Sequence, residues 1–353
     1  MRAHAFDAAF DLAGRQVEAG TVPYAILGVA GAERVDRLEA TGPLEGPRLG
    51  TGAVCLLASI TKAIVATAIV RLAQDGRFPM AMPLSTWMPE LDEASLLPFT
   101  AWHVLTHTTG LRDIALEELV VRGAPRDEVI RRTIELGQDS SPGSRFQYVT
   151  FAWDLLGTAV ERALDRPLED VLRETLLDPL GMTDTTFDHR RSGSRRALVQ
   201  LGEWDGTTRE LPAGVDAERL VASFASLRLA GGGLWSTAAD LLRFGRAMLR
   251  GGELDGIRVL GRPLVELMTR EVTVEGLGAT GDRLADEHYA MGWSKPATGR
   301  PGSALAFGHG GVSGTRLWID PAEDLVLVYL TGRWGGAGEA IEDIVMAAYG
   351  GLR

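Results

Sequence analysis

At both ends of the chain, the pattern of apolar and polar positions is typical of β-strands. Residues 24–30 form a short and almost wholly apolar run, which predicts a buried strand. Near the C-terminus, strand-like runs are separated by turns containing glycine or proline; they lie at 289–293, 305–309, 315–320 and 325–330. A second strand is expected within residues 31–50 and a short one at 53–57. The pattern therefore indicates a sheet assembled from both termini.

Helical spacing of apolar residues marks most of the remaining chain. The run that begins at Ser59 is apolar on nearly every face, which predicts a buried helix that ends near Asp75. Ser236 or Thr237 is typical of the cap of a later helix. The other helical blocks are expected at 5–19, 100–107, 115–136, 151–164, 167–176, 257–272 and 336–349.

This order of elements predicts an α+β fold in which an antiparallel sheet is flanked by helices. Residues 1–79 and 230–353 are expected to form an α/β domain. Residues 80–229 are expected to form an inserted, mostly helical domain, because prolines punctuate short helical blocks there. An active-site cleft is expected between the two domains, since such junctions often hold binding sites.

The composition and net charge limit the kinds of partner that the protein is expected to bind. The chain has 353 residues, of which 45% are hydrophobic and 24% charged, and this is typical of a globular protein. The net charge of -11 argues against nucleic-acid binding, which requires positive charge.

The sequence also bears on localisation. Charges at Asp11, Arg15 and Glu18 interrupt any signal-peptide core, and no apolar run approaches the roughly 18 residues that span a bilayer. The single cysteine, Cys55, excludes an intramolecular disulfide. We expect a cytoplasmic protein that does not bind membranes, and the oligomeric state stays open.

Ser59 and Lys62 stand three residues apart at the start of the buried helix, so their side chains share one face. One interpretation is structural, with Ser59 as a helix cap and Lys62 extending to the surface. The other is chemical: burial lowers the pKa of an amine, and a neutral amine can accept the proton of a serine nucleophile. The spacing alone favours the structural interpretation.

Three further clusters are candidates for partners of this pair. His103 and His107 have a spacing that could serve a metal, but packing and capping are the simpler interpretation. Tyr148 is expected where a loop meets a helix. It could be an aromatic anchor for packing or a general base. Residues 307–314 are dense in glycine, which indicates close approach of another backbone or a ligand, and their N–H groups could stabilise an oxyanion.

Taken together and in this order, these clusters resemble the serine β-lactamase-like family. The most similar branch is that of class C β-lactamases, D-alanyl-D-alanine carboxypeptidases and their esterase relatives. The Ser-x-x-Lys, Tyr-x-Asn and His-Gly-Gly motifs of the family correspond to Ser59-Ile60-Thr61-Lys62, Tyr148-Val149-Thr150 and His309-Gly310-Gly311. The segments 105–111, 178–185 and 231–237 also fit the family, and the resemblance extends from about residue 20 to 335.

The resemblance implies a β-lactamase/transpeptidase-like fold and a role for each motif residue. Ser59 would be the acylated nucleophile, Lys62 would assist its deprotonation, and Tyr148 would transfer protons to the leaving group and from water. Which of Lys62 and Tyr148 is the base stays open. The backbone N–H groups of Ser59 and Val312 would form the oxyanion hole, and His309 would keep positive or donor character beside it.

One departure from the motifs concerns the substrate. Thr150 stands where Asn is usual. With His309, Gly310 and Gly311 it would form the substrate-binding site, and its side chain offers only a hydroxyl in place of an amide. His309 also replaces the usual lysine, so a small-molecule ester is favoured over an amide or β-lactam. We therefore predict a serine hydrolase of the carboxylesterase type, with no cofactor and no metal.

Several alternatives remain open at this point. The same acyl-enzyme would serve an acyltransferase if an alcohol or amine replaced water. The chain could also be a β-lactamase or D-alanyl-D-alanine peptidase, or a sensor that is acylated without turnover.

Overall fold

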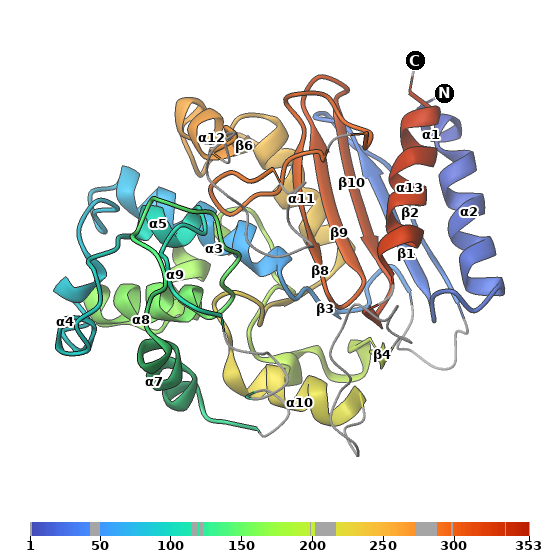
Figure 1. The fold of residues 1–353 in the computed structure, drawn as a ribbon. Coiled ribbons are helices and arrows are strands. Elements are labelled where there is room, and N and C mark those ends of the chain that lie inside the picture. The colour runs from blue at the N-terminus through green and yellow to red at the C-terminus, as the bar shows by residue number, and fades with distance from the viewer. Residues whose placement is uncertain are drawn as a thin grey trace.

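A five-stranded antiparallel sheet is built from both ends of the chain, as Figure 1 shows. The computed structural model describes residues 2–42, 50–113, 119, 123–197, 199–201, 217–272, 288–297, 299–335 and 337–352. The strands are ordered β2 (Val35–Thr41), β1 (Ala25–Ala30), β10 (Leu325–Leu330), β9 (Thr315–Asp320) and β8 (Phe307–Gly311). The N-terminal strand β1 pairs with β10 near the C-terminus, with Leu27 opposite Tyr329. The predicted sheet from both termini is confirmed.

Helices from the two termini cover one face of this sheet (Figure 1). They are α2 (Asp7–Glu18) and α13 (Gly338–Gly350), preceded in the chain by the short α1 (Arg2–Ala5). The buried Gln16 links three elements, because its amide donates to the Ala340 carbonyl at 2.8 Å and accepts from the Tyr329 hydroxyl at 2.6 Å. Both polar atoms of Gln16 are therefore satisfied inside an apolar layer.

Helix α11 (Ala238–Leu249) packs on the opposite face of the sheet. Its cap is Thr237, whose side chain accepts from the Asp240 N–H, so one of the two predicted capping residues is confirmed. Gly245 allows the close approach, since a Cβ atom there would lie 2.5 Å from the Cγ1 atom of Val326. The helix therefore crosses the sheet nearer than a larger residue would permit.

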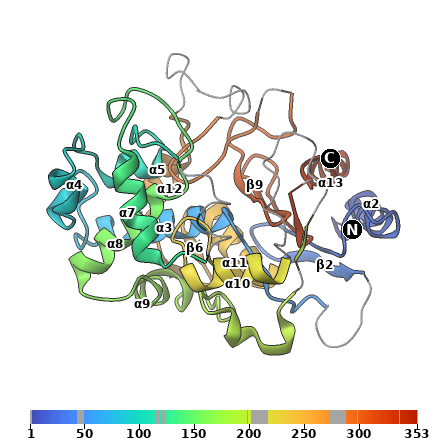
Figure 2. The same cartoon turned by 60° about the horizontal axis from the view of Figure 1, so that its bottom comes forward.

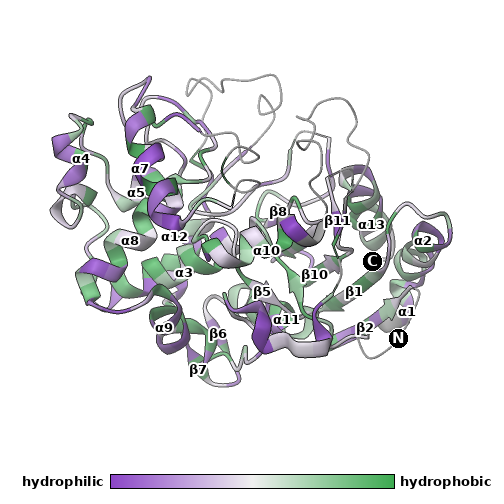
Figure 3. Ribbon diagram, turned by 90° about the horizontal axis from the view of Figure 1, so that it is seen from below, coloured by the Kyte–Doolittle hydropathy of each residue, from purple (hydrophilic) through white to green (hydrophobic). Residues whose placement is uncertain are grey.

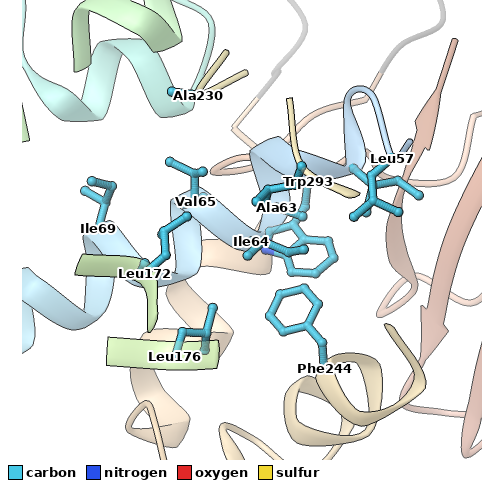
Figure 4. Packing of buried hydrophobic residues seen from close by; sticks show 14 of the residues in the cluster. Leu57, Ala63, Ile64, Val65, Ile69, Leu172, Leu176, Ala230, Phe244 and Trp293 are labelled. Carbon is cyan, nitrogen blue, oxygen red and sulfur yellow. The ribbon is translucent and has the colours of Figure 1, made fainter. Parts of the chain in front are cut away.

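Helix α3 (Ile60–Gln74) lies between the sheet and the remaining helices in Figures 1 and 2. Almost every side chain from Ile60 to Leu72 is buried, and the helix is largely green on the hydropathy scale of Figure 3. Figure 4 shows Ile64 beside Trp293, whose ring stacks on that of Phe244 with centroids 5.7 Å apart. The predicted buried helix is confirmed.

The elements on the far side of α3 are mostly short helices (Figures 1 and 2). They are α4 (Glu90–Glu93), α5 (Ala101–Leu105), α7 (Arg126–Leu136), α8 (Ala152–Leu164), α9 (Leu168–Leu172), and the 3-10 or π turns Leu84–Thr86 and Arg173–Leu177. The chain also forms α10 (Ala217–Leu227), which lies below α3 in Figure 1, and the 3-10 turn His189–Arg195. Two-residue strands pair as β3 (Cys55–Leu56) with β5 (Trp235–Ser236) and β4 (Gln200–Leu201) with β11 (Arg333–Trp334). Among the described residues, no helix has the length and apolar character needed to cross a bilayer.

Two of the predicted elements are wrong in part. The helix predicted at 257–272 begins later, as α12 (Arg262–Thr269), after a hairpin of β6 (Glu253–Leu254) and β7 (Ile257–Arg258). Residues 289–293 are not a strand and keep a single bridge from Tyr289 to Ser294. The reason is Gly292, which turns the chain with a φ of 74° where a Cβ atom would lie 2.5 Å from that of Ala66.

The block predicted at 115–136 is a helix only from Arg126, and residues 114–118 and 120–122 lie outside the described part of the chain.

The burial of α3 generates a stability prediction. Ile64 is 0% exposed, so we expect Ile64→Ala to lower the free energy of unfolding by about 2–5 kcal/mol through lost apolar contacts and a cavity. Urea denaturation would measure this loss. The matched control is Met346→Ala, because Met346 is 54% exposed and its removal should change stability by less than about 0.5 kcal/mol. Equal losses in the two variants would contradict the assigned core.

Candidate active site

Ser59 stands at the N-terminal end of α3, directly after a strained residue. Ala58 has a φ of 47°, in the left-handed region that non-glycine residues seldom adopt. The Ser59 side chain does not cap the helix, and its Oγ instead accepts a hydrogen bond from Lys62 Nζ at 3.2 Å. The structural interpretation of Ser59 as a cap is therefore wrong, and the two side chains face each other as the chemical interpretation requires.

Lys62 is completely buried, so the expectation that its amine extends to the surface is also wrong. Its Nζ donates to the Gly231 carbonyl at 2.7 Å in addition to its contact with Ser59. Burial lowers the pKa of Lys62 to about 7, and the charges of Asp113 and Asp154 oppose that shift. A buried amine that loses its proton near neutral pH can act as a base toward the serine hydroxyl.

Tyr148 lies in the loop before α8, and its ring packs against Lys62 and His107. Lys62 Nζ lies 4.8 Å from the ring centroid, and the His107 ring stacks on it with centroids 4.2 Å apart. Three residues predicted from distant motifs, Ser59, Lys62 and Tyr148, thus lie in one cluster. The aromatic packing holds the tyrosine against the amine.

His107 supports this cluster as a neutral ring. Its Nδ1 accepts from the Val149 N–H at 3.0 Å, which places the proton on Nε2. Burial lowers the pKa of His107 well below its ordinary value, and the nearby charge of Lys62 acts in the same direction. The histidine interpreted as a packing residue is buried, and His103 joins Thr100 in the capping box of α5.

The glycine-rich strand β8 is docked on the turn that precedes Ser59. A Cβ atom at Gly311 would lie 2.2 Å from the Leu57 carbonyl oxygen, so only glycine fits this approach. Just beyond, Ser313 Oγ donates to the Leu56 carbonyl at 2.7 Å and Thr315 Oγ1 donates to that of Leu57 at 2.9 Å. The close backbone approach predicted from the glycines is confirmed.

Two backbone amides are predicted to form an oxyanion hole, those of Ser59 and Val312. Val312 follows Gly311 directly, and its carbonyl accepts from the Gly335 N–H at 2.8 Å. Within the described residues, neither the Ser59 N–H nor the Val312 N–H donates to a protein acceptor. Amides left available beside a nucleophile are what an oxyanion hole requires.

His309 differs from its expected character in charge. Its Nδ1 donates to the Gly310 carbonyl at 2.7 Å, and burial lowers the pKa of His309 to about 3. The ring is therefore neutral, and its Nε2 accepts from the Tyr289 hydroxyl at 3.1 Å. Of the expected positive or donor character, burial and the nearby charge of Lys62 disfavour the positive charge, whereas Nδ1 remains a donor.

Thr150 lies at the edge of the same cluster. Its backbone N–H donates to Asp113 Oδ1 at 3.2 Å, and its side chain is partly exposed. Its carbonyl oxygen packs against Gly231, where a Cβ atom would lie 2.9 Å away. The structure therefore places Thr150 beside the carbonyl that holds Lys62, and its role toward a substrate stays a prediction.

Two residues of this site, Asp154 and Gly231, are missed by motif reasoning. Their link to Lys62 is long-range, through the hydrogen bond of Asp154 to Ala230 and that of Gly231 to the amine.

A signal for the importance of Lys62 itself lies in the composition. Of 36 lysines and arginines, only Lys62 and Lys295 are lysines, and an arginine at position 62 could not give up its proton. In the described residues, no cluster of histidine, cysteine and carboxylate side chains could hold a metal ion.

Comparison with known proteins adds independent findings. The family model named Beta-lactamase matches residues 18–350. Protein Rv1367c of Mycobacterium tuberculosis is 33% identical over 324 residues, covering 78% of this chain and 76% of the relative. Esterase EstB of Burkholderia gladioli is 30% identical over 332 residues, covering 82% of this chain and 81% of the relative.

A solved structure shares the fold. EstCE1, described as a hydrolase with promiscuous acyltransferase activity, matches with a TM-score of 0.80 at 20% identity. The match covers 98% of this chain and 99% of that chain. At this identity the likeness concerns the fold alone.

The buried amine generates a direct titration test. With only two lysines, protein labelled with ¹³C at lysine Cε should give two lysine signals, and Lys295→Arg would identify which belongs to Lys62. We expect the Lys62 signal to titrate with a pKa of about 7, because burial penalises the ammonium form. A midpoint near the ordinary lysine value of about 10.4 would contradict the assigned environment.

Proposed function

Because this chain belongs to the beta-lactamase family of serine hydrolases, we propose that it forms an acyl-enzyme at Ser59 and hydrolyses small carboxylic esters. One observation carries the proposal: a fully buried lysine, with its pKa lowered to about 7, donates a hydrogen bond to the serine Oγ. A snorkelling lysine and a capping serine would show neither feature. The pair instead has the arrangement of an activated nucleophile and its base.

Acylation begins with attack of Ser59 Oγ on the ester carbonyl carbon. The serine proton passes to the Lys62–Tyr148 pair, and the carbonyl oxygen becomes an oxyanion. The N–H groups of Ser59 and Val312 would stabilise that charge, and loss of one such donor costs about 2.7–4 kcal/mol in related hydrolases. Collapse of the intermediate expels the alcohol, which takes up the proton and leaves the acyl group on Ser59.

Deacylation repeats these steps with water as the nucleophile. Water attacks the acyl carbon, its proton enters the same pair, and Ser59 recovers a proton as the carboxylic acid leaves. Tyr148 is the proposed proton carrier to the leaving group, because its ring is held against Lys62 Nζ and His107. Either Lys62 or Tyr148 can serve as the first base, since both assignments move the same single proton through the pair.

The preference for esters rests on the charge of the site. His309 is neutral, so it offers no cation to the carboxylate that a penicillin or a peptide terminus carries. Thr150 lacks the amide donor that would bind an acylamino side chain. The name of the Burkholderia gladioli relative, Esterase EstB, supports the same substrate class.

Acyl transfer is a second candidate that uses the same intermediate. The description of EstCE1 includes promiscuous acyltransferase activity, and its fold is shared over almost the whole chain. An alcohol that enters in place of water would take the acyl group from Ser59. Addition of acceptor alcohols to a p-nitrophenyl ester assay, with analysis for the new ester, separates transfer from hydrolysis.

The nucleophile is tested with p-nitrophenyl butyrate and a fluorophosphonate. We expect the wild-type protein to release nitrophenol and to gain one fluorophosphonate adduct, and Ser59→Ala to lose both, because the acyl-enzyme cannot form. The matched control is Ser226→Ala, since Ser226 is an exposed serine on α10. An acylated sensor would take up the label and release no nitrophenol beyond one equivalent. Release that survives in Ser59→Ala would assign the nucleophile elsewhere.

The substrate preference is tested with nitrocefin. We expect turnover of this β-lactam by the wild-type protein to be far below that of p-nitrophenyl butyrate. Thr150→Asn should raise the ratio of nitrocefin to ester turnover, because it restores an amide donor at this position. Comparable kcat/KM values for the two substrates in the wild-type protein would contradict the ester preference.

A further inference from the structure

A short segment, Ala230–Leu234, ties helix α8 to helix α3, which carries Lys62. We call it the strap. On one side its Ala230 N–H donates to Asp154 Oδ1 of α8 at 2.9 Å. On the other, its Leu234 N–H donates to Thr61 Oγ1 of α3 at 3.1 Å, and the carbonyl of Leu234 accepts from the Leu57 N–H at 2.9 Å. Between these ends, the Gly231 carbonyl receives Lys62 Nζ at 2.7 Å.

The strap has little room to move. A Cβ atom at Gly231 would lie 2.9 Å from the Thr150 carbonyl oxygen and 3.1 Å from Trp153 Cβ. The position of the Gly231 carbonyl is therefore fixed by the start of α8, where Asp154 lies. A shift of the strap would move the acceptor of Lys62, and with it the amine that faces Ser59.

Asp154 is an unusual residue to find at this point, because it is 0% exposed in a cluster of apolar side chains. One oxygen binds Ala230, and the other has no hydrogen-bond partner in the part of the chain that the structure describes. Burial raises the pKa of Asp154 to about 6, whereas the positive charges of Arg126 and Lys62 lower it. A buried carboxylate that served only as a backbone acceptor would be replaceable by a neutral amide at less cost in desolvation.

The charges that face Lys62 come from every element around it. Asp113 follows α5, Asp154 lies on α8, and both favour the ammonium form. His107 and His309 also face the amine, but burial keeps both rings neutral. Tyr148 packs against it through the face of its ring. Asp154 itself faces two positive charges, those of Arg126 on α7 and of Lys62. Arg126 is also paired with Glu161, with Nη1 and Oε2 2.8 Å apart.

We propose that Asp154 is a positioning residue for Ser59 acylation: it anchors the strap that orients Lys62, and its charge sets how readily that amine gives up its proton. The proposal rests on the proposed function of Ser59 and Lys62. It assigns no contact between Asp154 and the substrate. It requires that the negative charge of Asp154, and not only its hydrogen bond, affect the titration of Lys62.

The test is Asp154→Asn, which keeps an oxygen for the Ala230 N–H and removes the charge. We expect the ¹³Cε signal of Lys62 to titrate at a lower pH than in the wild-type protein, because a neighbouring negative charge that favours the ammonium form is gone. The acid limb of kcat/KM against pH should move to lower pH with it. Because an amide oxygen is a weaker acceptor than a carboxylate, the strap should hold Lys62 less firmly, and the kcat value should fall by up to about 100-fold.

The matched control is Asp240→Asn. Asp240 is likewise a buried aspartate in the first turn of a helix, and its Oδ2 accepts from the Asp184 N–H at 2.9 Å and from the Thr185 hydroxyl at 2.8 Å. Its loss should lower stability and leave the Lys62 titration and the pH profile unchanged. Thermal denaturation of both variants separates a fold defect from an effect on the amine.

A second variant keeps the test independent of the folding of Asp154→Asn. Arg126→Gln removes the cation beside Asp154, so the carboxyl should bind a proton more readily, and the Lys62 titration should move in the same downward direction.

A Lys62 titration that matches the wild-type protein in Asp154→Asn, or in Arg126→Gln where Asp154→Asn does not fold, would overturn the proposal. So would an unchanged kcat in a folded Asp154→Asn variant. Failure of the proposed function is seen separately, as absence of a Ser59 adduct in the wild-type protein, because the titration requires no activity.

Discussion

The fully buried amine of Lys62 is the constraint around which the site is arranged. An ammonium group without water is costly, and each nearby group reduces that cost or shifts the balance toward the neutral amine. The Gly231 carbonyl and the Ser59 hydroxyl accept its hydrogen bonds, and two carboxylates oppose the effect of burial. Two neutral histidines and the face of Tyr148 complete its surroundings. The same desolvation that makes the amine expensive makes it a base near neutral pH.

A second constraint is the distance between β8 and the turn before Ser59. Gly311 permits backbone contact with Leu57, and the hydroxyls of Ser313 and Thr315 fix that contact by binding two successive carbonyls. These bonds hold the strained turn at Ala58 in place beside the end of β8, so the proposed nucleophile and the proposed oxyanion donor Val312 would keep a fixed relation. The strand edge and the helix terminus thus act as one rigid unit, and this preorganisation is what electrostatic catalysis requires.

Local patterns predicted the elements well where the pattern extends over a whole element. Strands β9 and β10 and helix α3 follow from short apolar runs between turn residues, and the expected sheet from both termini is confirmed. The prediction fails at residues 289–293, where an apolar run bends at Gly292 to pass Ala66 of α3. It also fails in the start of α12, where a two-residue hairpin precedes the helix. The division into two domains stays a prediction.

The site shows the same limit. The i, i+3 spacing places Ser59 and Lys62 together, and the family resemblance indicates Tyr148 and the glycine-rich strand. The charge of His309 could not be predicted, because it depends first on how deeply the tertiary structure buries the ring and then on the nearby charge of Lys62. Asp154, and the role of Gly231 within the segment 231–237, were missed for a related reason: their effect on Lys62 passes through backbone atoms, whose contacts the residue types do not reveal.

The sheet from both termini has a consequence for synthesis of the chain. Strand β1 emerges from the ribosome well before its partner β10 and before the β8 edge that packs on the turn preceding Ser59. A nascent chain that lacks them holds Ser59 and Lys62 without the Ser313 and Thr315 hydroxyls that bind the Leu56 and Leu57 carbonyls, and without the Val312 amide. Assembly of the sheet must wait for long-range pairing, which is slow and cooperative. The hydrogen bonds that fix the turn before Ser59 can therefore form only after β8 and the residues that follow it have been made.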